Sequence, residues 1–343
     1  MRRVMWWMSS LALFGCVEPP SSDEPPAFEG WGDAPGPVTA PPRVTLDAVR
    51  VVAWNMESVG VPGGPSFLAA ERILRRLDAE LVCLNEVDDY ELDELALLAG
   101  ALGYETVLVP LDNPFGGLRN ALLSRLPAVA SAMPTAQVLS DDGQANDVTR
   151  TPVAIEVALA EGEGAGTLSL TCQHFKSGFD ADDVFRRTVD VARTGQASAL
   201  LSADVALIAG DFNAQLGDAF EPGALTETPW GLPSSYRLGS DLALQLQDVG
   251  LTHSPFRELG NRGFEVIDAV QRDGDPATRP VSGRRIDYIA VQNTVVAYEA
   301  LAEVYDPLDE GLEGLPMSGD APPATDGALA SDHLPVVVDL MFR

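Results

Sequence analysis

Short apolar runs that are flanked by Asn, Asp, Glu or His recur along this chain, and they restrict its possible folds more than any other feature. The runs are rich in β-branched and aliphatic side chains, which is typical of buried β-strands. The flanking polar clusters are Asn55 to Glu57, Asn85 to Glu86, His174 to Lys176, Asp211 to Asn213, Asp287, and Asp332 to His333. A strand end buried in a core gains nothing from a carboxylate, so this recurrence points to a role other than packing.

The apolar periodicity predicts a layered mixture of strands and helices. Helices are predicted at 66–77, from Asp88 or Asp89 to near Gly103, and at about 182–201. Strands are predicted at 49–54, 81–84, 104–109, 121–124, 127–130, 151–159, 167–174, 204–209, 287–291, 295–298 and 334–340, with AEGEGAG as a hairpin connection. Strands outnumber helices and several consecutive ones look antiparallel, so we expect an α+β or layered α/β fold with packed sheets and outer helices.

The N-terminus predicts an exported protein. Arg2 and Arg3 precede an apolar run that is too short to span a bilayer and is followed by Cys16. This pattern resembles a bacterial lipoprotein signal, in which the cysteine is lipidated; an ordinary signal peptide is the alternative. Residues 17–42 contain eight prolines and no basic residue, which favours an extended tether. We therefore expect an outer-membrane or cell-surface lipoprotein, or a periplasmic or secreted protein, with a signal at 1–15, a tether at 16–47 and one folded domain at 48–343.

The chain carries 51 acidic against 22 basic residues, a formal charge of −29. Such a charge repels polyanions at long range, so it argues against nonspecific binding to nucleic acids or anionic membranes. A phosphate-containing substrate would need cations or clustered arginines at the site. The acidic region after Arg285 favours a solvated face over a calcium-binding loop, because no calcium-ligand spacing is recognisable.

Cys83 and Cys172 lie within apolar strand-like runs. Export would permit a disulfide, but two buried thiols are the favoured interpretation. Their spacing does not suggest a zinc site.

Each polar cluster has a structural explanation when it is taken alone. Asn55 could cap a turn, Asp211 could cap a helix and His333 could be a hydrogen-bonded core histidine. Together, however, the clusters supply carboxylates, histidines and amides at strand ends, which are the groups that a divalent-metal hydrolase uses.

The order of the motifs resembles the endonuclease/exonuclease/phosphatase superfamily. The motifs are N-x-E at 55–57, NE at 85–86, HFKS at 174–177, GDFN at 210–213, IDY at 286–288 and SDH at 331–333. The resemblance spans about residues 48–343 and is closest in motif form to secreted bacterial nucleases. It implies a four-layered α/β sandwich, in which two packed, mostly antiparallel β-sheets are flanked by helices, and a metal-dependent phosphoric ester hydrolase.

The resemblance also implies a role for each site residue. Glu86 would bind Mg²⁺, or Mn²⁺ or Ca²⁺, with help from Asn55 and Glu57, and Asp332 is a second candidate ligand. Asp211 would activate the attacking water, and Asn213 would donate to a phosphate oxygen. His333, oriented by Asp287, would bind the scissile phosphate, and His174 would contact it from the opposite side and protonate the leaving oxygen.

Substrate contacts and substrate class remain open between alternatives. Arg150, Arg285 and Lys176, the only lysine of the chain, are candidate phosphate contacts, whereas Arg186 and Arg187 are expected on a solvated helix face. Asn120 lines the site or is structural. A nuclease for DNA or RNA, monomeric and anchored to a membrane through its N-terminal lipid, is the first hypothesis. A lipid or small-molecule phosphoesterase is the second, and the net charge favours it; a catalytically dead binding module is disfavoured.

Overall fold

The computed structural model describes residues 48–111, 113–159, 166–219, 232–242, 254–292 and 298–342. These residues belong to one compact unit, Ala40–Arg343. The predicted signal peptide, Cys16 and the tether lie outside the described residues, and so does the 160–165 part of the predicted hairpin connection. Within the described part, no helix is long and apolar enough to cross a membrane.

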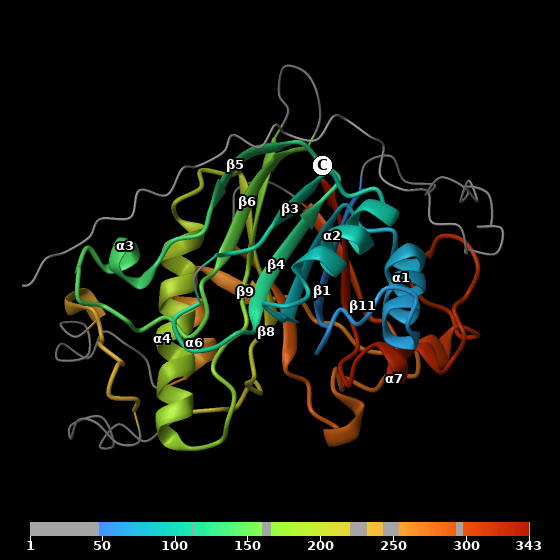
Figure 1. Cartoon of the computed structure of the whole chain (residues 1–343). Helices are drawn as coiled ribbons and strands as arrows, with labels where there is room; N and C mark the ends of the chain where they lie inside the picture. Colours follow the sequence, from blue (N-terminus) through green and yellow to red (C-terminus); the bar gives the residue numbers. More distant parts are fainter. Residues whose placement is uncertain are drawn as a thin grey trace, which may run out of the picture. The chain divides into compact units, whose positions relative to one another are not determined.

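Two six-stranded sheets form the centre of the fold (Figure 1). In spatial order, the first sheet consists of β11 (Tyr298–Val304), β12 (Val336–Phe342), β1 (Ala48–Asn55), β2 (Leu81–Val87), β4 (Arg119–Ser124) and β3 (Thr106–Leu108). The second consists of β5 (Ala128–Ala132), β6 (Val153–Ala158), β7 (Thr167–Cys172), β8 (Val205–Asp211), β10 (Asp287–Gln292) and β9 (Phe264–Val266). Most neighbouring strands are antiparallel, but β1 and β2 are parallel, and so are β7 and β8. Both sheets are therefore mixed.

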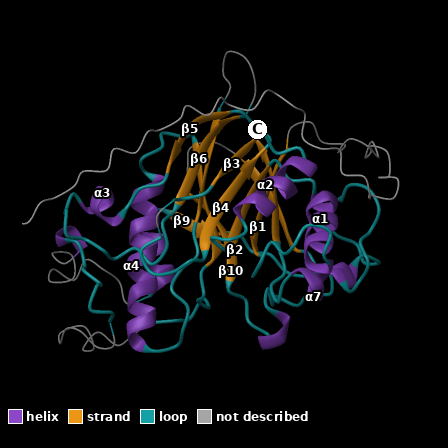
Figure 2. Cartoon of the chain, in the orientation of Figure 1, coloured by secondary structure: helices purple, strands orange, loops and turns teal. Residues whose placement is uncertain are grey.

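Helices cover the outer side of each sheet (Figure 2). The first sheet carries α1 (Pro65–Leu77), α2 (Leu92–Ala101) and α7 (Asp326–Ala330), and the second carries α4 (Ala181–Ser198) and α6 (Pro255–Asn261). The short helix α3 (Ala136–Ser140) packs beside α4. Two short 3₁₀ turns, η2 (Pro280–Ser282) and η3 (Pro307–Asp309), lie in loops.

The main core lies between the two sheets. Because strand side chains alternate between faces, Val51 and Ala53 of β1 pack against the second sheet, whereas Val52 and Trp54 pack under α1 and α2. All four side chains are fully buried. The result is the four-layered sandwich that the sequence predicts.

Most predicted elements are confirmed, and the differences have local causes. α2 begins after Glu91 rather than at Asp88 or Asp89. The strand predicted to reach His174 ends at Cys172, so the HFKS segment is a loop. Strand β11 continues to Val304, beyond the predicted strand at 295–298, of which only residue 298 is described. The short elements α3, α6, α7 and β9 were not predicted, because the few apolar residues in each form no clear period.

The acidic C-terminal region is not simply a solvated face. Its carboxylates form ion pairs with arginines of earlier elements, namely Arg50–Asp339, Arg72–Asp326, Arg76–Glu310 and Arg272–Glu303. The Arg50 side chain is fully buried in its pair with Asp339, which joins β1 to β12. These contacts tie the C-terminal region to β1, to α1 and to the loop that follows β9.

Candidate active site

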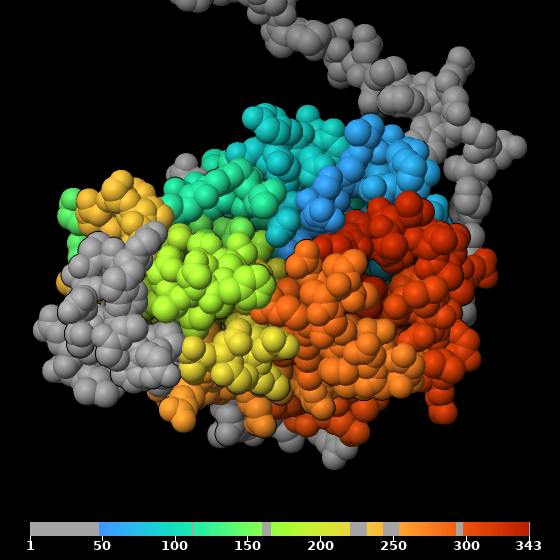
Figure 3. All heavy atoms as spheres, turned by 90° about the horizontal axis from the view of Figure 1, so that it is seen from below, coloured from blue at the N-terminus to red at the C-terminus, as the bar shows by residue number. Residues whose placement is uncertain are grey.

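Strand pairing brings the predicted polar clusters to one edge of the sandwich. The parallel pairs place the ends of β1 and β2 together and the ends of β7 and β8 together. The antiparallel pairs place the first residue of β10, Asp287, opposite Asp211 at the end of β8, and the start of β12 opposite the end of β1. Figure 3 views the molecule from below, where blue, yellow-green, orange and red segments lie side by side. Residues far apart in sequence therefore share one site.

Glu86 is turned into the site by an irregular backbone. The β2–β4 register shifts between Leu84 and Val87, and Glu86 adopts φ 62°, which is unusual for a residue other than glycine. The Asn55 amide donates to Glu86 Oε1 at 3.1 Å and to Asp211 Oδ2 at 3.0 Å. Asn55 thus bridges carboxylates from the two sheets.

His174 lies between the same two carboxylates. Its Nε2 is 3.6 Å from Glu86 Oε1 and 3.4 Å from Asp211 Oδ2. The ring is buried, and neither ring nitrogen has a hydrogen-bond partner in the described part of the chain. Burial lowers the pKa of His174 well below its usual value, and the positive charge of Arg150 acts in the same direction. His174 is therefore a neutral imidazole with both nitrogens available.

Asp211 follows Gly210, a position at which a side chain would clash with the neighbouring loop. A Cβ on Gly210, which has φ 133°, would lie 2.0 Å from the Gln173 carbonyl oxygen of the neighbouring β7 loop. Beyond it, Asp211 Oδ1 accepts from the backbone N–H of Asn213 at 2.7 Å, and the Asn213 amide donates to the Phe175 carbonyl at 3.2 Å. Burial raises the pKa of Asp211 to about 7, and the neighbouring charge of Asp287 acts in the same direction.

His333 is held by Asp287. His333 Nδ1 is 2.8 Å from Asp287 Oδ2, the same oxygen that accepts from Thr278 Oγ1 at 2.6 Å. Burial alone would lower the pKa of His333, but the charge of Asp287 and its hydrogen bond raise it to about 9. The loop that carries His333, just before β12, is fixed to β1: Ser331 Oγ donates to the Asn55 carbonyl, and Trp54 Nε1 donates to the His333 carbonyl. At neutral pH the site thus pairs an imidazolium at His333 with a neutral His174.

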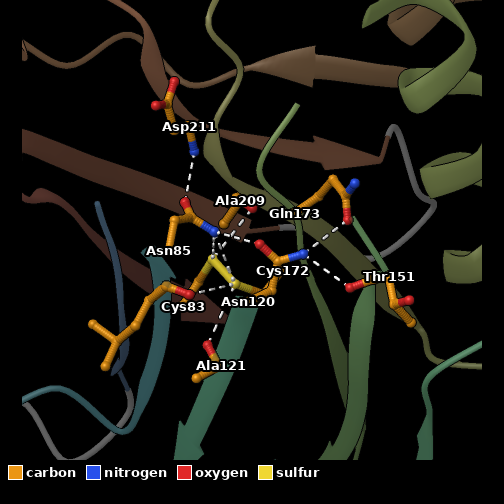
Figure 4. Close-up of a disulfide and its surroundings, with 10 residues drawn as sticks. Cys83, Asn85, Asn120, Ala121, Thr151, Cys172, Gln173, Ala209 and Asp211 are labelled. Carbon is orange, nitrogen blue, oxygen red and sulfur yellow. Dashed lines mark hydrogen bonds between the residues drawn. A yellow bond between two sulfur atoms is a disulfide. The ribbon is translucent and has the colours of Figure 1, made fainter. Parts of the chain in front are cut away.

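A buried polar network supports these groups from below (Figure 4). Asn85 Oδ1 accepts from the backbone N–H of Asp211 at 2.8 Å, and its amide donates to Asn120 Oδ1 at 2.9 Å. Asn120 donates in turn to Thr151 O and to Gln173 Oε1. Asn120 is therefore structural: it links β4 to the β7 loop and does not line the site.

The expectation of two free thiols is wrong. Cys83 of β2 and Cys172 of β7 form a disulfide with their Cα atoms 5.2 Å apart, so the bond joins the two sheets directly beneath the site (Figure 4). The two cysteines are 89 residues apart, and sequence gives no sign that the fold stacks one strand over the other.

The remaining predicted residues lie at different distances from the cluster. Glu57 is exposed, and Asp332 is in an ion pair with Arg279, with its Oδ1 3.6 Å from His333 Nε2. The Lys176 ammonium is 2.9 Å from Asp183 Oδ1, and Arg285 is paired with Asp268. The structure therefore brings together Asn55, Glu86, His174, Asp211, Asn213, Asp287 and His333. Glu57 is exposed, and Lys176 and Arg285 pair with carboxylates outside this cluster.

The sequence interpretation missed residues at or beside the candidate site. Thr278 donates to Asp287, and Arg279 pairs with Asp332; both lie in a loop without apolar periodicity. Arg186 was expected, together with Arg187, on a solvated helix face, but both are buried. The only sequence signal for Thr278 and Arg279 was their position shortly before the IDY motif, and this position does not predict which residues they contact.

Comparisons with known proteins agree with this geometry. The model of the endonuclease/exonuclease/phosphatase family matches residues 52–333. Three solved structures share the fold. An endonuclease/exonuclease/phosphatase from Beutenbergia cavernae is 17% identical, with a TM-score of 0.51 and coverage of 86% of this chain and 72% of that one. The human Nocturnin catalytic domain with bound sulfate is 17% identical, with a TM-score of 0.51 and coverage of 87% and 95%.

ANGEL2, described as a 2′,3′-cyclic phosphatase, is 13% identical, with a TM-score of 0.55 and coverage of 85% and 95%. No curated protein matches the chain. The match of the family model over most of the chain, on a site built from the ends of two packed sheets, shows that the protein belongs to the endonuclease/exonuclease/phosphatase family.

Proposed function

We propose that this protein is an exported, divalent-metal-dependent phosphodiesterase that cleaves nucleic acid. The observation that carries the proposal is the cluster of Glu86, His174 and Asp211 beside the Asp287–His333 pair. This arrangement could place a metal ion and two histidines of different charge around one substrate phosphate.

The residues present fit a hard cation. Glu86 and Asp211 come from different sheets, and each places a carboxylate oxygen within 3.6 Å of the same His174 nitrogen. Oxygen ligands with several retained waters are what Mg²⁺ prefers. Glu86, with Asn55 beside it, is the residue that would hold the ion; when bound, the ion would neutralise charge on a phosphate oxygen. Mn²⁺ and Ca²⁺ are the alternatives.

The protein groups divide the acid and base work. Asp211, with its pKa near neutrality, can take a proton from a water molecule. His333 is protonated up to about pH 9 and can donate from Nε2 to a phosphate oxygen as negative charge develops there. The neutral His174 faces the same position and can donate or accept a hydrogen bond at the leaving oxygen.

Export and a nucleic-acid substrate rest on separate observations. A disulfide persists in oxidising compartments, which supports export as the N-terminal segment predicts. The name of the family covers nucleases and phosphatases, and the HFKS motif resembles that of secreted bacterial nucleases. A lipid or small phosphoester substrate is the alternative.

A substrate panel tests the proposal. We expect the full chain to cleave bis-p-nitrophenyl phosphate and plasmid DNA or RNA with Mg²⁺, and to lose activity in EDTA. Glu86→Gln should weaken Mg²⁺ binding by at least tenfold in calorimetry, and Glu57→Gln, an exposed carboxylate two residues from Asn55, is the matched control. Full activity in chelator would refute the metal requirement, and cleavage of sphingomyelin without cleavage of nucleic acid would refute the substrate.

A further inference from the structure

Two arginines beside the site lack a carboxylate partner in a chain that has a large excess of carboxylates. Eleven of the described arginines make an ion pair. Arg150 and Arg186 are among the six described arginines that make none with a described residue, and both line the same pocket. Arg150 Nη1 donates only to the carbonyls of His174 and Phe175, at 3.4 and 3.2 Å. The negative charges of Glu86, Asp190 and Asp211 act on Arg150 at longer range, but no described carboxylate forms an ion pair with either guanidinium. Both groups can therefore still pair with the anion of a ligand.

Both guanidiniums line one pocket of about 310 Å³. Phe115, Thr149, Lys176 and Ser177 complete its main walls, and no described residue that lines it is acidic. The volume is at the lower end of the range for small-ligand pockets, which suits one group of a larger substrate. Through Arg150, the pocket adjoins the backbone of His174 and therefore the catalytic cluster.

Arg186 lies beside two aromatic rings in this pocket. Its guanidinium lies over the rings of Phe115 and Tyr236, 5.1 and 5.3 Å from their centroids, and its Nε has no partner. Stacking of this kind orients the planar fork while leaving its N–H groups for an anion.

Neither nearby carboxylate of α4 occupies the pocket. Asp183 pairs with Lys176 at 2.9 Å. Asp190 accepts from the backbone N–H groups of Thr149 and Lys176 at 2.8 and 2.9 Å, so it links the two segments that line the pocket at these residues. The arginines are thus left for a ligand.

We propose that this pocket, between Arg150 and Arg186, is a subsite for a second phosphate of the substrate, next to the phosphate that is cleaved. The inference rests on the proposed phosphodiesterase function and narrows its substrate to molecules with two or more phosphates, such as oligonucleotides. A lipid with a single phosphodiester cannot use this subsite.

The test compares substrates that differ by one phosphate. The full chain with Mg²⁺ is given thymidylyl-thymidine (TpT) and the same dinucleotide with a terminal phosphate on its 5′ or 3′ end. We expect kcat/KM for one phosphorylated form to exceed that for TpT by roughly tenfold to a hundredfold, the range for hydrogen bonds to charged groups. In Arg186→Met this ratio should fall towards one, and in Arg186→Lys it should be intermediate.

A binding measurement gives a second readout that needs no turnover. In EDTA, thymidine 3′,5′-bisphosphate should bind more tightly than thymidine 5′-phosphate, and Arg186→Met should remove the difference. Arg237→Gln is the matched control, because Arg237 also lacks a described carboxylate partner but is exposed and does not line the pocket. It should leave both ratios unchanged.

The two proposals fail in different ways. If the wild-type chain cleaves TpT and its phosphorylated forms equally and binds both nucleotides equally, the subsite is refuted and the phosphodiesterase stands. These wild-type measurements decide the matter even if an Arg186 variant does not fold. If no phosphodiester is cleaved with any metal, the proposed function itself fails.

Discussion

Asp287 is the residue that sets the charge of His333. Its carboxylate raises the pKa of His333 to about 9, so the imidazolium persists below that pH and is lost above it. In Asp287→Asn the largest charge that offsets burial is lost, while the smaller effects of Asp211 and Asp332 remain, so the pKa of His333 should fall towards its ordinary value of about 6.5. We expect the basic limb of the pH profile of kcat/KM to move down by about two pH units, and the rate at pH 8 to fall by about ten- to thirtyfold. Bis-p-nitrophenyl phosphate is a suitable substrate.

Thr278→Val is the matched control for Asp287→Asn. It removes the 2.6 Å hydrogen bond to Asp287 Oδ2 but keeps the negative charge, so the basic limb should stay close to its wild-type position. A limb that does not move in Asp287→Asn would contradict the role of His333 as the proton donor.

At the scale of elements, the disulfide joins β2 to β7 and therefore fixes one sheet against the other. A crosslink that closes a loop of this length restricts the unfolded chain, and we expect Cys83→Ala/Cys172→Ala to lower the free energy of unfolding by about 2–4 kcal/mol. Urea unfolding with and without reductant measures the effect. Incubation of wild type with reductant under unfolding conditions should lower its midpoint to that of the variant, whereas the variant should not respond. Equal stability of oxidised wild type and variant would show that the crosslink contributes nothing.

The elements also show what sequence alone can and cannot reveal. Helix α1 and strands β1 and β8 were predicted closely because their apolar spacing is set by burial on known faces. The order of the motifs placed Asp211 and His333 at one site through a family resemblance. The disulfide, the turn of Lys176 towards Asp183 and the burial of Arg186 could not be predicted, because each depends on which elements pack together across the sandwich.

At the scale of the whole molecule, the charge of −29 sets how the protein meets a polyanion. A nuclease that binds through an extended basic groove neutralises 6–10 phosphates, and its affinity falls by about 10³ to 10⁵-fold between 50 and 200 mM salt. Here the described basic groups near the site are few, and the surrounding field is repulsive. Two phosphate contacts on a single strand predict a fall of only about sevenfold over that range, and screening of the repulsion should reduce it further.

The measurement is kcat/KM for a single-stranded oligonucleotide between 50 and 200 mM NaCl at constant free Mg²⁺, with TpT as the short reference. A shallow dependence would place recognition in the scissile phosphate and its neighbour, as Arg150 and Arg186 suggest. A fall of a thousandfold would instead require a long basic surface, which the described residues do not provide. Because the repulsion acts at long range and the guanidiniums act at contact, such an enzyme should bind nucleic acid weakly and select it by local geometry.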